Sequence, residues 1–365
     1  MSEWQTFCLK DLGKIVGGAT PSTNNPKNYG NKIAWITPKD LSTLQGRYIK
    51  KGSRSISRLG FKSCSCVLLP KHAILFSSRA PIGYVAIAKK RLCTNQGFKS
   101  IIPNKKIYFE FLYYLLKYHK DNISNIGGGT TFKEVSGATL GLFKVKIPPT
   151  YYEQQKIART LSILDQKIEN NHKINELLHT LAYKIYEYYF KYKPKNAKLE
   201  QIIIENPKSS IMVKNAQKTQ DKYPFFTSGD NILFYPKAII DGRNCFLNTG
   251  GNAGIKFYVG KASYSTDTWC ICANEFIDYL YLLLSSIKTH INQSFFQGTS
   301  LKHLQKNLLK KYPIYMPSAH EIKKFNQIIM PLLTLISINT RTSKKLEQIR
   351  DFLLPLLLTQ QVKPQ

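Results

Sequence analysis

Residues 153–190 read EQQKIARTLSILDQKIENNHKINELLHTLAYKIYEYYF. Their apolar residues recur at alternating spacings of four and three over five heptads, which is typical of the a/d seam of a coiled coil. At ~1.5 Å per residue, such a helix is ~60 Å long and too long to lie hidden within a domain of this size. The stretch therefore predicts a long helix that pairs with a second one. The seam positions are Ile157, Leu161, Leu164, Ile168, Asn171, Asn175, Leu178, Ala182, Ile185 and Tyr189.

The second helix is found in the same chain, because the pattern recurs 168 residues later. Its seam positions are Phe325, Ile329, Leu332, Ile336, Asn339, Ser343, Leu346, Arg350, Leu353 and Leu357. Ser343 and Arg350 are the weaker matches, and Pro331 predicts a break, a kink or a new segment one turn into the helix. Asn171 and Asn339 stand near the midpoints of their helices. We predict that they hydrogen-bond across an antiparallel seam and fix its register.

The internal repeat extends beyond the helices. Gly129-Thr130-Thr131-Phe132-Lys133 recurs as Gly298-Thr299-Ser300-Leu301-Lys302, and residues 77–83 loosely parallel residues 248–254. Each copy leads through a short alternating strand and a proline into a long helix. The predicted fold class is α+β, with two mixed α/β domains, two long antiparallel coiled-coil helices between them, and a pseudo-twofold internal repeat. We expect domain boundaries at 1–150, 151–193, 194–318 and 319–365.

The charge of the chain predicts a polyanionic partner. The 365 residues carry 53 Lys and Arg against 22 Asp and Glu, and residues 41–109 hold fourteen Lys and Arg with no acid. Strand-like runs at residues 66–69 and 73–76 indicate that this segment is folded, so its self-repulsion favours a phosphate-contacting surface. A solvated basic face is the plainer alternative. An anionic membrane is less suitable, because the basic residues do not lie on one amphipathic helix.

Other classes of protein are not expected from this sequence. No run of 18 apolar residues occurs, and the start of the chain shows no signal peptide, so we expect a cytoplasmic protein. The seven cysteines include two C-x-C pairs, which are poorly placed to chelate a metal tetrahedrally. We interpret the cysteines as free thiols and expect no structural zinc.

Several motifs occur in a fixed order along the chain. The first half contains GGATPS at 17–22, IAWITPKDL at 33–41, SRAPIG at 78–83 and NQGF at 95–98. The second half contains YPFFTSG at 223–229, and Gly-Thr-Thr/Ser-x-Lys precedes each long helix. Over nearly the whole chain, these motifs resemble the specificity subunit of a Type I restriction–modification enzyme. The second copy departs at residues 321–325, where the Glu153-Gln154 pair has no full counterpart; we interpret this as a weakened helix-start feature.

The resemblance implies a function and a set of partners. Residues 1–150 and 194–318 would be two target recognition domains, each reading one half of a bipartite site in double-stranded DNA. The helices would act as spacers that set the unread gap and dock two methyltransferase subunits, with motor-nuclease subunits as possible further partners. No cofactor is expected in this chain; S-adenosylmethionine and ATP are expected on the partner subunits.

Base recognition should depend on polar side chains in turns. Arg79 can bind guanine O6 and N7, and Asn95 and Gln96 can bind adenine. The candidates in the second half are Ser228, Asp230, Asn248, Asn252 and Asp267. For any one of these residues, a role as a local turn former is an equally good alternative to a contact with a base. We expect phosphate contacts from Thr130, Thr131, Lys133, Thr299, Ser300 and Lys302. Thr20, Ser22, Lys39 and Ser78 lie in the motifs of the resemblance and complete the predicted DNA-binding set.

We predict that the chain is not an enzyme. Its only Pro-Pro pair, Pro148-Pro149, lacks the flanking residues of a methyltransferase loop. The nuclease-like Asp165-Gln166-Lys167 and Glu321-Ile322-Lys323 should be solvated helix faces. Two alternatives stay open at this point: a self-contained DNA methyltransferase or nuclease with degenerate motifs, and a basic single-strand nucleic-acid-binding protein, which the aromatic content would suit.

Overall fold

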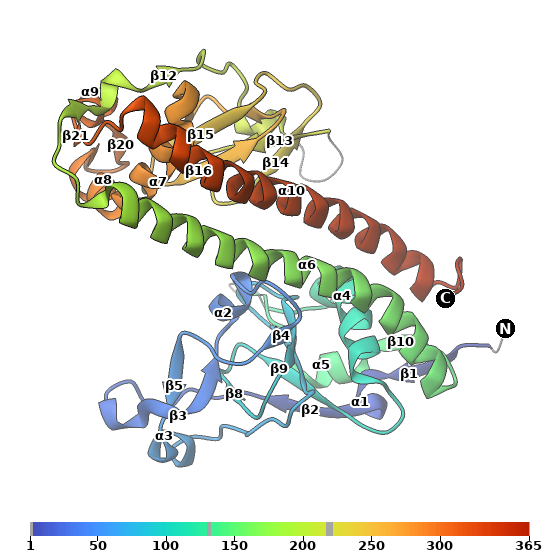
Figure 1. Ribbon diagram of the computed structural model, residues 1–365. Helices are drawn as coiled ribbons and strands as arrows, with labels where there is room; N and C mark the ends of the chain where they lie inside the picture. Colours follow the sequence, from blue (N-terminus) through green and yellow to red (C-terminus); the bar gives the residue numbers. More distant parts are fainter. Residues whose placement is uncertain (1–2, 130–132, 217–221, 365) are drawn as a thin grey trace. The chain divides into compact units, whose positions relative to one another are not determined.

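The computed structural model describes residues 3–129, 133–216 and 222–364. They form two compact units, one of residues 1–170 with 345–365 and the other of residues 171–344. Each unit contains a globular part and portions of both long helices, α6 (Tyr151–Tyr186) and α10 (Ala319–Leu358), drawn green and red in Figure 1. The boundaries predicted from the sequence separate the chain by element, whereas these units follow the packing.

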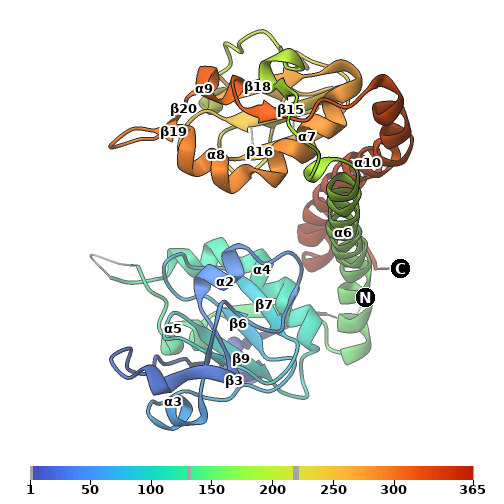
Figure 2. The same ribbon diagram turned by 60° about the vertical axis from the view of Figure 1, so that its left-hand side comes forward.

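Unit 1 is built on a five-stranded sheet. Its strands run in the order β2 (Gly13–Gly17), β9 (Lys99–Pro103), β6 (Ile74–Phe76), β7 (Val85–Ala88) and β4 (Tyr48–Ile49). Helix α4 (Phe109–Asn125) packs against β6 and β7 (Figure 2) and buries Phe111 and Tyr114. All three residues of β6 are buried, as expected for a central strand whose two faces are both covered.

Smaller elements complete unit 1. A second sheet has the order β5 (Arg54–Ile56), β3 (Tyr29–Ile36) and β8 (Cys93–Thr94), and β1 (Gln5–Cys8) pairs with β10 (Lys144–Ile147). The short helices are α1 (Leu9–Leu12), α2 (Pro38–Ser42), α3 (Arg58–Lys62) and α5 (Gly137–Leu142). The strand expected at residues 66–69 is absent, because only Leu69 forms a bridge, with Leu92.

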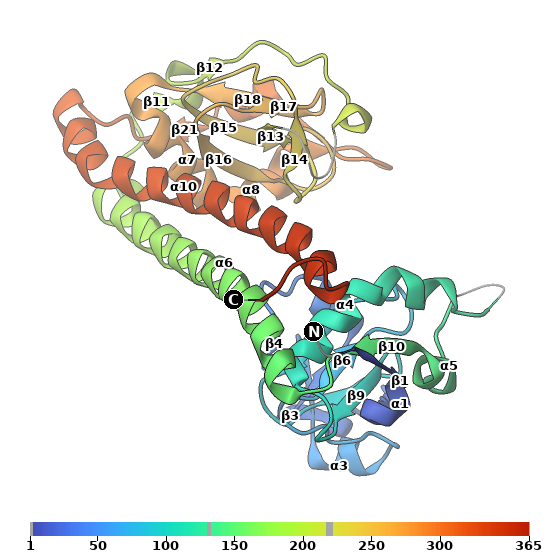
Figure 3. The same ribbon diagram turned by 90° about the vertical axis from the view of Figure 1, so that its right-hand side faces the viewer.

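Unit 2 contains a four-stranded and a three-stranded sheet. The first has the order β12 (Ile204–Glu205), β18 (Thr268–Cys272), β15 (Arg243–Asn248) and β16 (Ile255–Val259), and the second β14 (Leu233–Tyr235), β13 (Tyr223–Phe226) and β17 (Ser263–Tyr264). Helix α7 (Ile277–Ser286) packs on β15 and β16 (Figure 3). Two short pairs are β11 (Ala197–Lys198) with β21 (Pro313–Ile314) and β19 (Phe296–Gln297) with β20 (His303–Leu304). Helix α8 (Lys288–Ser294) precedes β19, and helix α9 (Lys306–Lys310) lies between β20 and β21.

The two units share most of their topology: the strand order β12-β18-β15-β16 matches β2-β9-β6-β7, to which unit 1 adds β4. The parallel pair β3–β8, with Trp35 opposite Cys93, has its counterpart in β13–β17, with Phe225 opposite Ser263. The pairs β1–β10 and β11–β21 correspond in the same way and lead into α6 and α10. The α+β class and the internal repeat are therefore confirmed.

Both long helices begin with a Ser/Thr-x-x-Glu capping arrangement. The amide of Glu153 donates to the hydroxyl of Thr150 at 3.2 Å, and that of Glu321 donates to the hydroxyl of Ser318 at 3.3 Å. The amide of Ser318 also donates to the Glu321 carboxylate at 2.9 Å, which completes a capping box. The interpretation of a weakened second helix start was therefore wrong.

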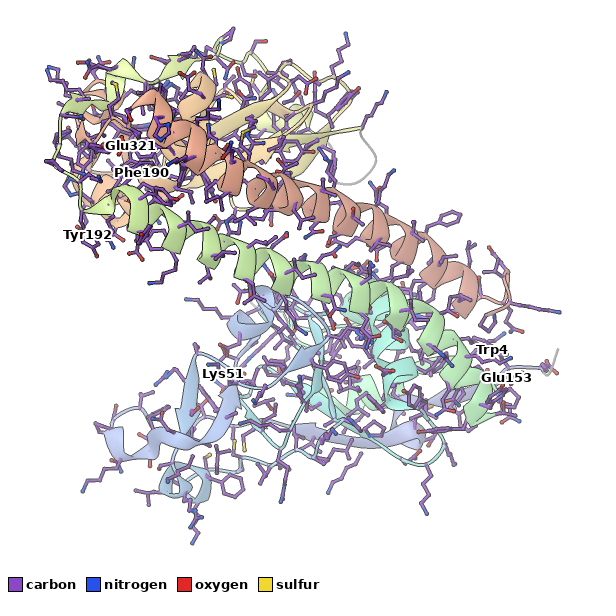
Figure 4. All side chains as sticks on the ribbon, in the orientation of Figure 1. Trp4, Lys51, Glu153, Phe190, Tyr192 and Glu321 are labelled. Atoms are coloured by element: carbon purple, nitrogen blue, oxygen red, sulfur yellow. The ribbon has the colours of Figure 1, made fainter. Side chains whose placement is uncertain are left out.

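What the second copy loses is a side-chain anchor. Gln154 is buried; it accepts the amide of Tyr108 at 2.8 Å and donates to the carbonyl of Lys106 at 3.0 Å. Its counterpart Ile322 lies instead in the apolar core of unit 2. The same core contains Phe190, which lies in the turn after α6. Figure 4 shows Phe190 close to Glu321.

In unit 1, α6 and α10 pack antiparallel. Ile157 and Leu161 share a core cluster with Leu354 and Leu357. Arg350 donates to Asp165 at 2.6 Å, and the hydroxyl of Tyr114 donates to the same carboxylate at 2.5 Å. Asp165 is therefore a buried partner in an ion pair and not the solvated helix-face residue that we expected.

In unit 2, the asparagines reach across the seam. Asn171 donates to the hydroxyl of Ser343 at 3.1 Å, and Asn339 donates to the side-chain oxygen of Asn175 at 3.0 Å. Asn175 donates in turn to Thr340 at 3.3 Å. Asn171 and Asn339 do not meet each other, because Asn171 lies opposite Ser343 and is therefore one turn away from Asn339. Their role in fixing the register stays a prediction.

Pro331 does not interrupt the second helix. Helix α10 runs from Ala319 to Leu358 as one element, so the break or new segment predicted at Pro331 was wrong. Arg243 from β15 supports this part of the helix by donating to the hydroxyl of Thr334 at 2.8 Å and to the carbonyl of Met330 at 3.4 Å. The carbonyl that loses its helical donor at Pro331 is that of Gln327, so these bonds hold the neighbouring turn to the sheet rather than replace the lost bond.

Candidate nucleic-acid interface

In unit 1, three segments that are far apart in the sequence meet at one place. They are the loop of residues 77–83, the turn of residues 95–98 and the antiparallel bridge between Gly128 and Glu134. The amide of Ser78 donates to the carbonyl of Gly97 at 2.8 Å, and the amide of Val135 donates to the carbonyl of Ser78 at 3.0 Å. Ser78 is therefore the residue through which the loop holds the other two segments.

Three equivalent segments meet in unit 2. The loop is residues 248–254, the turn is residues 265–268, and the bridge joins Gln297 of β19 to His303 of β20. The amide of Thr249 donates to the carbonyl of Asp267 at 3.2 Å, and the amide of Leu304 donates to the carbonyl of Thr249 at 3.0 Å. The repeat seen in the sequence thus extends to individual backbone hydrogen bonds.

Each loop is closed by the buried side chain of its first residue. The hydroxyl of Ser77 donates to the carbonyl of Pro81 at 2.8 Å. In the second copy, the side-chain amide of Asn248 donates to the carbonyl of Asn252 at 3.1 Å. In both loops the side chain of the first residue bonds to the carbonyl of the fifth, although the residue types differ. This confirms the parallel between residues 77–83 and 248–254.

The predicted DNA-contacting residues differ in their accessibility. The exposed ones are Thr20, Ser22, Lys39, Gln96, Lys133, Asp230, Asn252, Thr299, Ser300 and Lys302, and the half-buried ones are Arg79, Asn95, Ser228 and Asp267. Ser78 and Asn248 are buried. Thr130 and Thr131 lie outside the described residues. The placement of Ser78 and Asn248 favours a loop-holding role over a contact with a ligand.

Several of the half-buried candidates act as turn formers. The side-chain oxygen of Asn95 accepts the amide of Gly97 at 3.0 Å, as in an Asx turn. Ser228 accepts the amide of Thr249 at 3.2 Å and donates to the carbonyl of Asp267. By contrast, the hydroxyl of Thr20 donates to the side-chain oxygen of Gln96, so these two exposed candidates from distant motifs lie side by side.

Comparison with known proteins decides the family. The family model "Type I restriction modification DNA specificity domain" matches residues 1–180 and again residues 195–348. The chain is also 33% identical over 403 aligned positions to the specificity subunit of the Type I restriction enzyme MjaIX of Methanocaldococcus jannaschii, an alignment that covers 98% of this chain and 93% of that protein. The chain belongs to the family of Type I DNA specificity subunits.

Further relatives agree with this assignment. A 30% identity to the HindI specificity subunit of Haemophilus influenzae covers 46% of this chain and 37% of that protein. The crystal structure of a Type I S subunit from M. genitalium has the same fold, with a TM-score of 0.64 at 18% identity over 97% of this chain and 96% of that one. As a specificity subunit, the chain supplies DNA specificity rather than catalysis. The two alternatives, an autonomous enzyme and a single-strand binding protein, are not supported.

The basic segment of this specificity subunit is mostly accessible. Among the fourteen Lys and Arg of residues 41–109, all but Arg47, Arg79 and Lys99 are exposed. Arg47 is buried and bonds to Glu110 at 3.0 Å and to Glu169 at 3.1 Å, so its charge is neutralised within the protein. The exposed Lys and Arg side chains of this segment can contact phosphates.

Sequence reasoning missed three polar residues at the two sites. Glu134 and Lys99 in unit 1 form an ion pair at 3.1 Å. Lys256 in unit 2 donates to the side-chain oxygen of Asn248 at 2.9 Å, and its burial lowers the pKa of its ammonium group. Only Glu134 carried a sequence signal, because it follows Lys133 directly in the Gly-Thr-Thr-x-Lys motif.

The specificity subunit shows no sign of a metal or membrane site in its described part. Within residues 3–129, 133–216 and 222–364, no group of three or more His, Cys, Asp and Glu side chains is placed to hold a metal ion. In the same ranges, no helix is both long and apolar enough to cross a bilayer. All seven cysteines are free thiols, and four of them are buried: Cys66, Cys93, Cys245 and Cys270.

Proposed function

We propose that this chain reads a bipartite duplex site through two target recognition domains, residues 1–150 and 194–318. The observation that carries the proposal is the loop, turn and bridge that recur in both units with the same backbone hydrogen bonds. The side chains that they present differ: the first loop carries Arg79 where the second has Gly250. Equivalent frames with different side chains suit two unlike half-sites.

The two long helices would serve as spacers between the half-sites. Their seam contains polar pairs at Asn171–Ser343 and Asp165–Arg350, and polar residues in a seam favour a single register over shifted ones. A single register would give one gap length between the half-sites. This spacer role rests on residues 151–193 and 319–365.

The same helices would dock two methyltransferase subunits. With Ile168 and Ile336 at heptad position a, the large apolar residues that the two helices expose within unit 2 fall at positions g and c, except Met330 at position b. In an antiparallel pair, the g positions of both helices flank the same side of the seam. We call this set the g/c stripe. It consists of Ile174, Leu177 and Leu181 on α6, of Tyr188 in the π-helical turn that follows α6 (Glu187–Lys191), and of Ile328, Leu335 and Ile338 on α10.

The opposite side of each helix is already used by the unit itself. Leu333 and Ser337 of α10 are buried, and the Ser337 hydroxyl accepts the amide of Val259 at 3.1 Å. Tyr186 of α6 is buried against Tyr279. The g/c stripe is thus left for a protein partner, since an exposed apolar patch of this kind marks an interaction site.

We propose that S-adenosylmethionine and ATP belong to the partner subunits, with motor-nuclease subunits joining the assembly.

Contacts with phosphates and with bases should respond differently to mutation. We expect Lys133→Ala, which removes an exposed phosphate contact, to weaken DNA binding evenly across sequences and to lower the salt slope by about one. Arg79→Ala should instead reduce discrimination at one base position, at a cost of about 1–3 kcal/mol for the preferred base. Both are measured by titrating labelled duplexes with the purified chain at several salt concentrations. Equal losses on every duplex from both variants would contradict these roles.

A further inference from the structure

Glu134 is an acidic residue that faces two cations of the basic first domain. Its Oε2 lies 3.4 Å from Nη1 of Arg79, and its Oε1 lies 3.1 Å from Nζ of Lys99. Each carboxylate oxygen therefore has its own cation. The side chains of Arg79 and Glu134 are 37% and 34% exposed, so a ligand can still reach the guanidinium.

The backbone holds both ends of this ion pair in place. Glu134 exchanges two hydrogen bonds with Gly128, at 2.8 and 3.0 Å, and Val135 donates to the carbonyl of Ser78. Arg79 follows Ser78 in the loop that the side chain of Ser77 closes. With both backbones fixed, the ion pair limits the directions in which the guanidinium can point. An arginine has five N–H donors, and the bond to Glu134 occupies one nitrogen.

The second repeat has none of these three side chains. The bridge and the loop place His303 where unit 1 has Glu134, and Gly250 where it has Arg79. The equivalent of Lys99, one residue after the turn, is Trp269, which is buried. The ion pairs are thus an addition to the first domain and not part of the frame that both domains share.

We propose that Glu134 is a positioning residue that orients Arg79 for base recognition in the first half-site. The inference rests on the proposed function, because it requires that this domain read duplex DNA. A bond to Glu134 leaves the free edge of the guanidinium for guanine O6 and N7. Without Glu134, Arg79 can turn to a phosphate, which binds without specifying a base.

Glu134→Gln tests the proposal, because it keeps the size of the side chain and removes its charge. The probes are the host's bipartite target duplex and variants that carry each of the other three bases at every first half-site position. We expect wild type to prefer one base at one position by about 10-fold or more, within the range of about 5- to 150-fold that a bidentate contact of 1–3 kcal/mol gives. In the variant this preference should fall to about threefold or less by the same reasoning, with the second half-site unchanged.

The double variant separates positioning from a general effect of charge. In an Arg79→Ala background, Glu134→Gln should have no further effect on base preference. Glu275→Gln, at an exposed glutamate of unit 2, is the matched control and should behave as wild type.

Three outcomes would overturn the proposal: retained preference in Glu134→Gln, an equal affinity change on all duplexes, or a change of preference that persists without Arg79. If wild type itself shows no preference for any duplex, the proposed function fails instead.

Discussion

Replacing Arg350 with alanine is expected to lower the free energy of unfolding of unit 1 by about 3–5 kcal/mol. Arg350 Nη1 lies 2.6 Å from Asp165, whose side chain is only 5% exposed. Burial alone would lower the pKa of Arg350, but the Asp165 carboxylate raises it above its ordinary value, so the guanidinium stays charged. Without Arg350, the nearest cation to Asp165 is Arg47, at 3.9 Å. The cost is that of a buried carboxylate without its close counter-ion.

Urea unfolding followed by circular dichroism measures this loss. Arg159→Ala, at an exposed arginine on α6, is the matched control and should stay within about 0.5 kcal/mol of wild type. Adding Asp165→Asn to Arg350→Ala should recover part of the stability, because it removes the stranded charge. A variant Arg350→Ala as stable as Arg159→Ala would show that the ion pair does not stabilise the helix pairing in unit 1.

Placing charges in the g/c stripe should abolish docking of the methyltransferase subunits. We expect the double variant Leu181→Asp and Leu335→Asp to lose affinity for the methyltransferase subunit by about 100-fold or more, because buried apolar anchors dominate interfaces of this kind. The two residues are 49% and 42% exposed, so the free chain should fold normally. Its binding to DNA should not change either.

The control for this experiment changes the same number of charges on the same helices. Thr180 and Gln327 are exposed neighbours that lie outside the stripe, so Thr180→Asp with Gln327→Asp should bind the methyltransferase subunit like wild type. Calorimetric titration of each variant with the purified methyltransferase subunit gives the affinities. Equal losses from both double variants, or none from either, would rule out the stripe as the docking face.

The long helices could be predicted from the sequence because a seam leaves a strict periodic pattern. The two weak matches in that pattern, Ser343 and Arg350, proved informative: both lie in the seam and bond to polar partners on α6. The facing pairs could not be derived, because periodicity gives the buried face of each helix but not the offset between two helices. The break predicted at Pro331 was wrong for a similar reason: the neighbouring turn of α10 is held by Arg243 from β15, a contact that the sequence does not reveal.

The candidate sites were only partly readable from the sequence. Motif residues such as Arg79 and Gln96 could be proposed from the sequence because they stand in turns within the motifs, and their contact with DNA stays a prediction. Whether a turn residue points outward or closes its own loop depends on its neighbours, and Ser78 and Asn248 face inward. Glu134 was missed because its partners Arg79 and Lys99 precede it by 55 and 35 residues, a proximity that only the folded chain creates.

Sequencing the methylated bases of a host genome with and without this gene tests the specificity role most directly. We expect deletion to erase methylation at one bipartite motif, with two unlike half-sites separated by a fixed number of unspecified bases, and reintroduction of the gene to restore it. An unchanged methylation pattern after deletion, or methyl transfer by the purified chain without any partner subunit, would contradict that role.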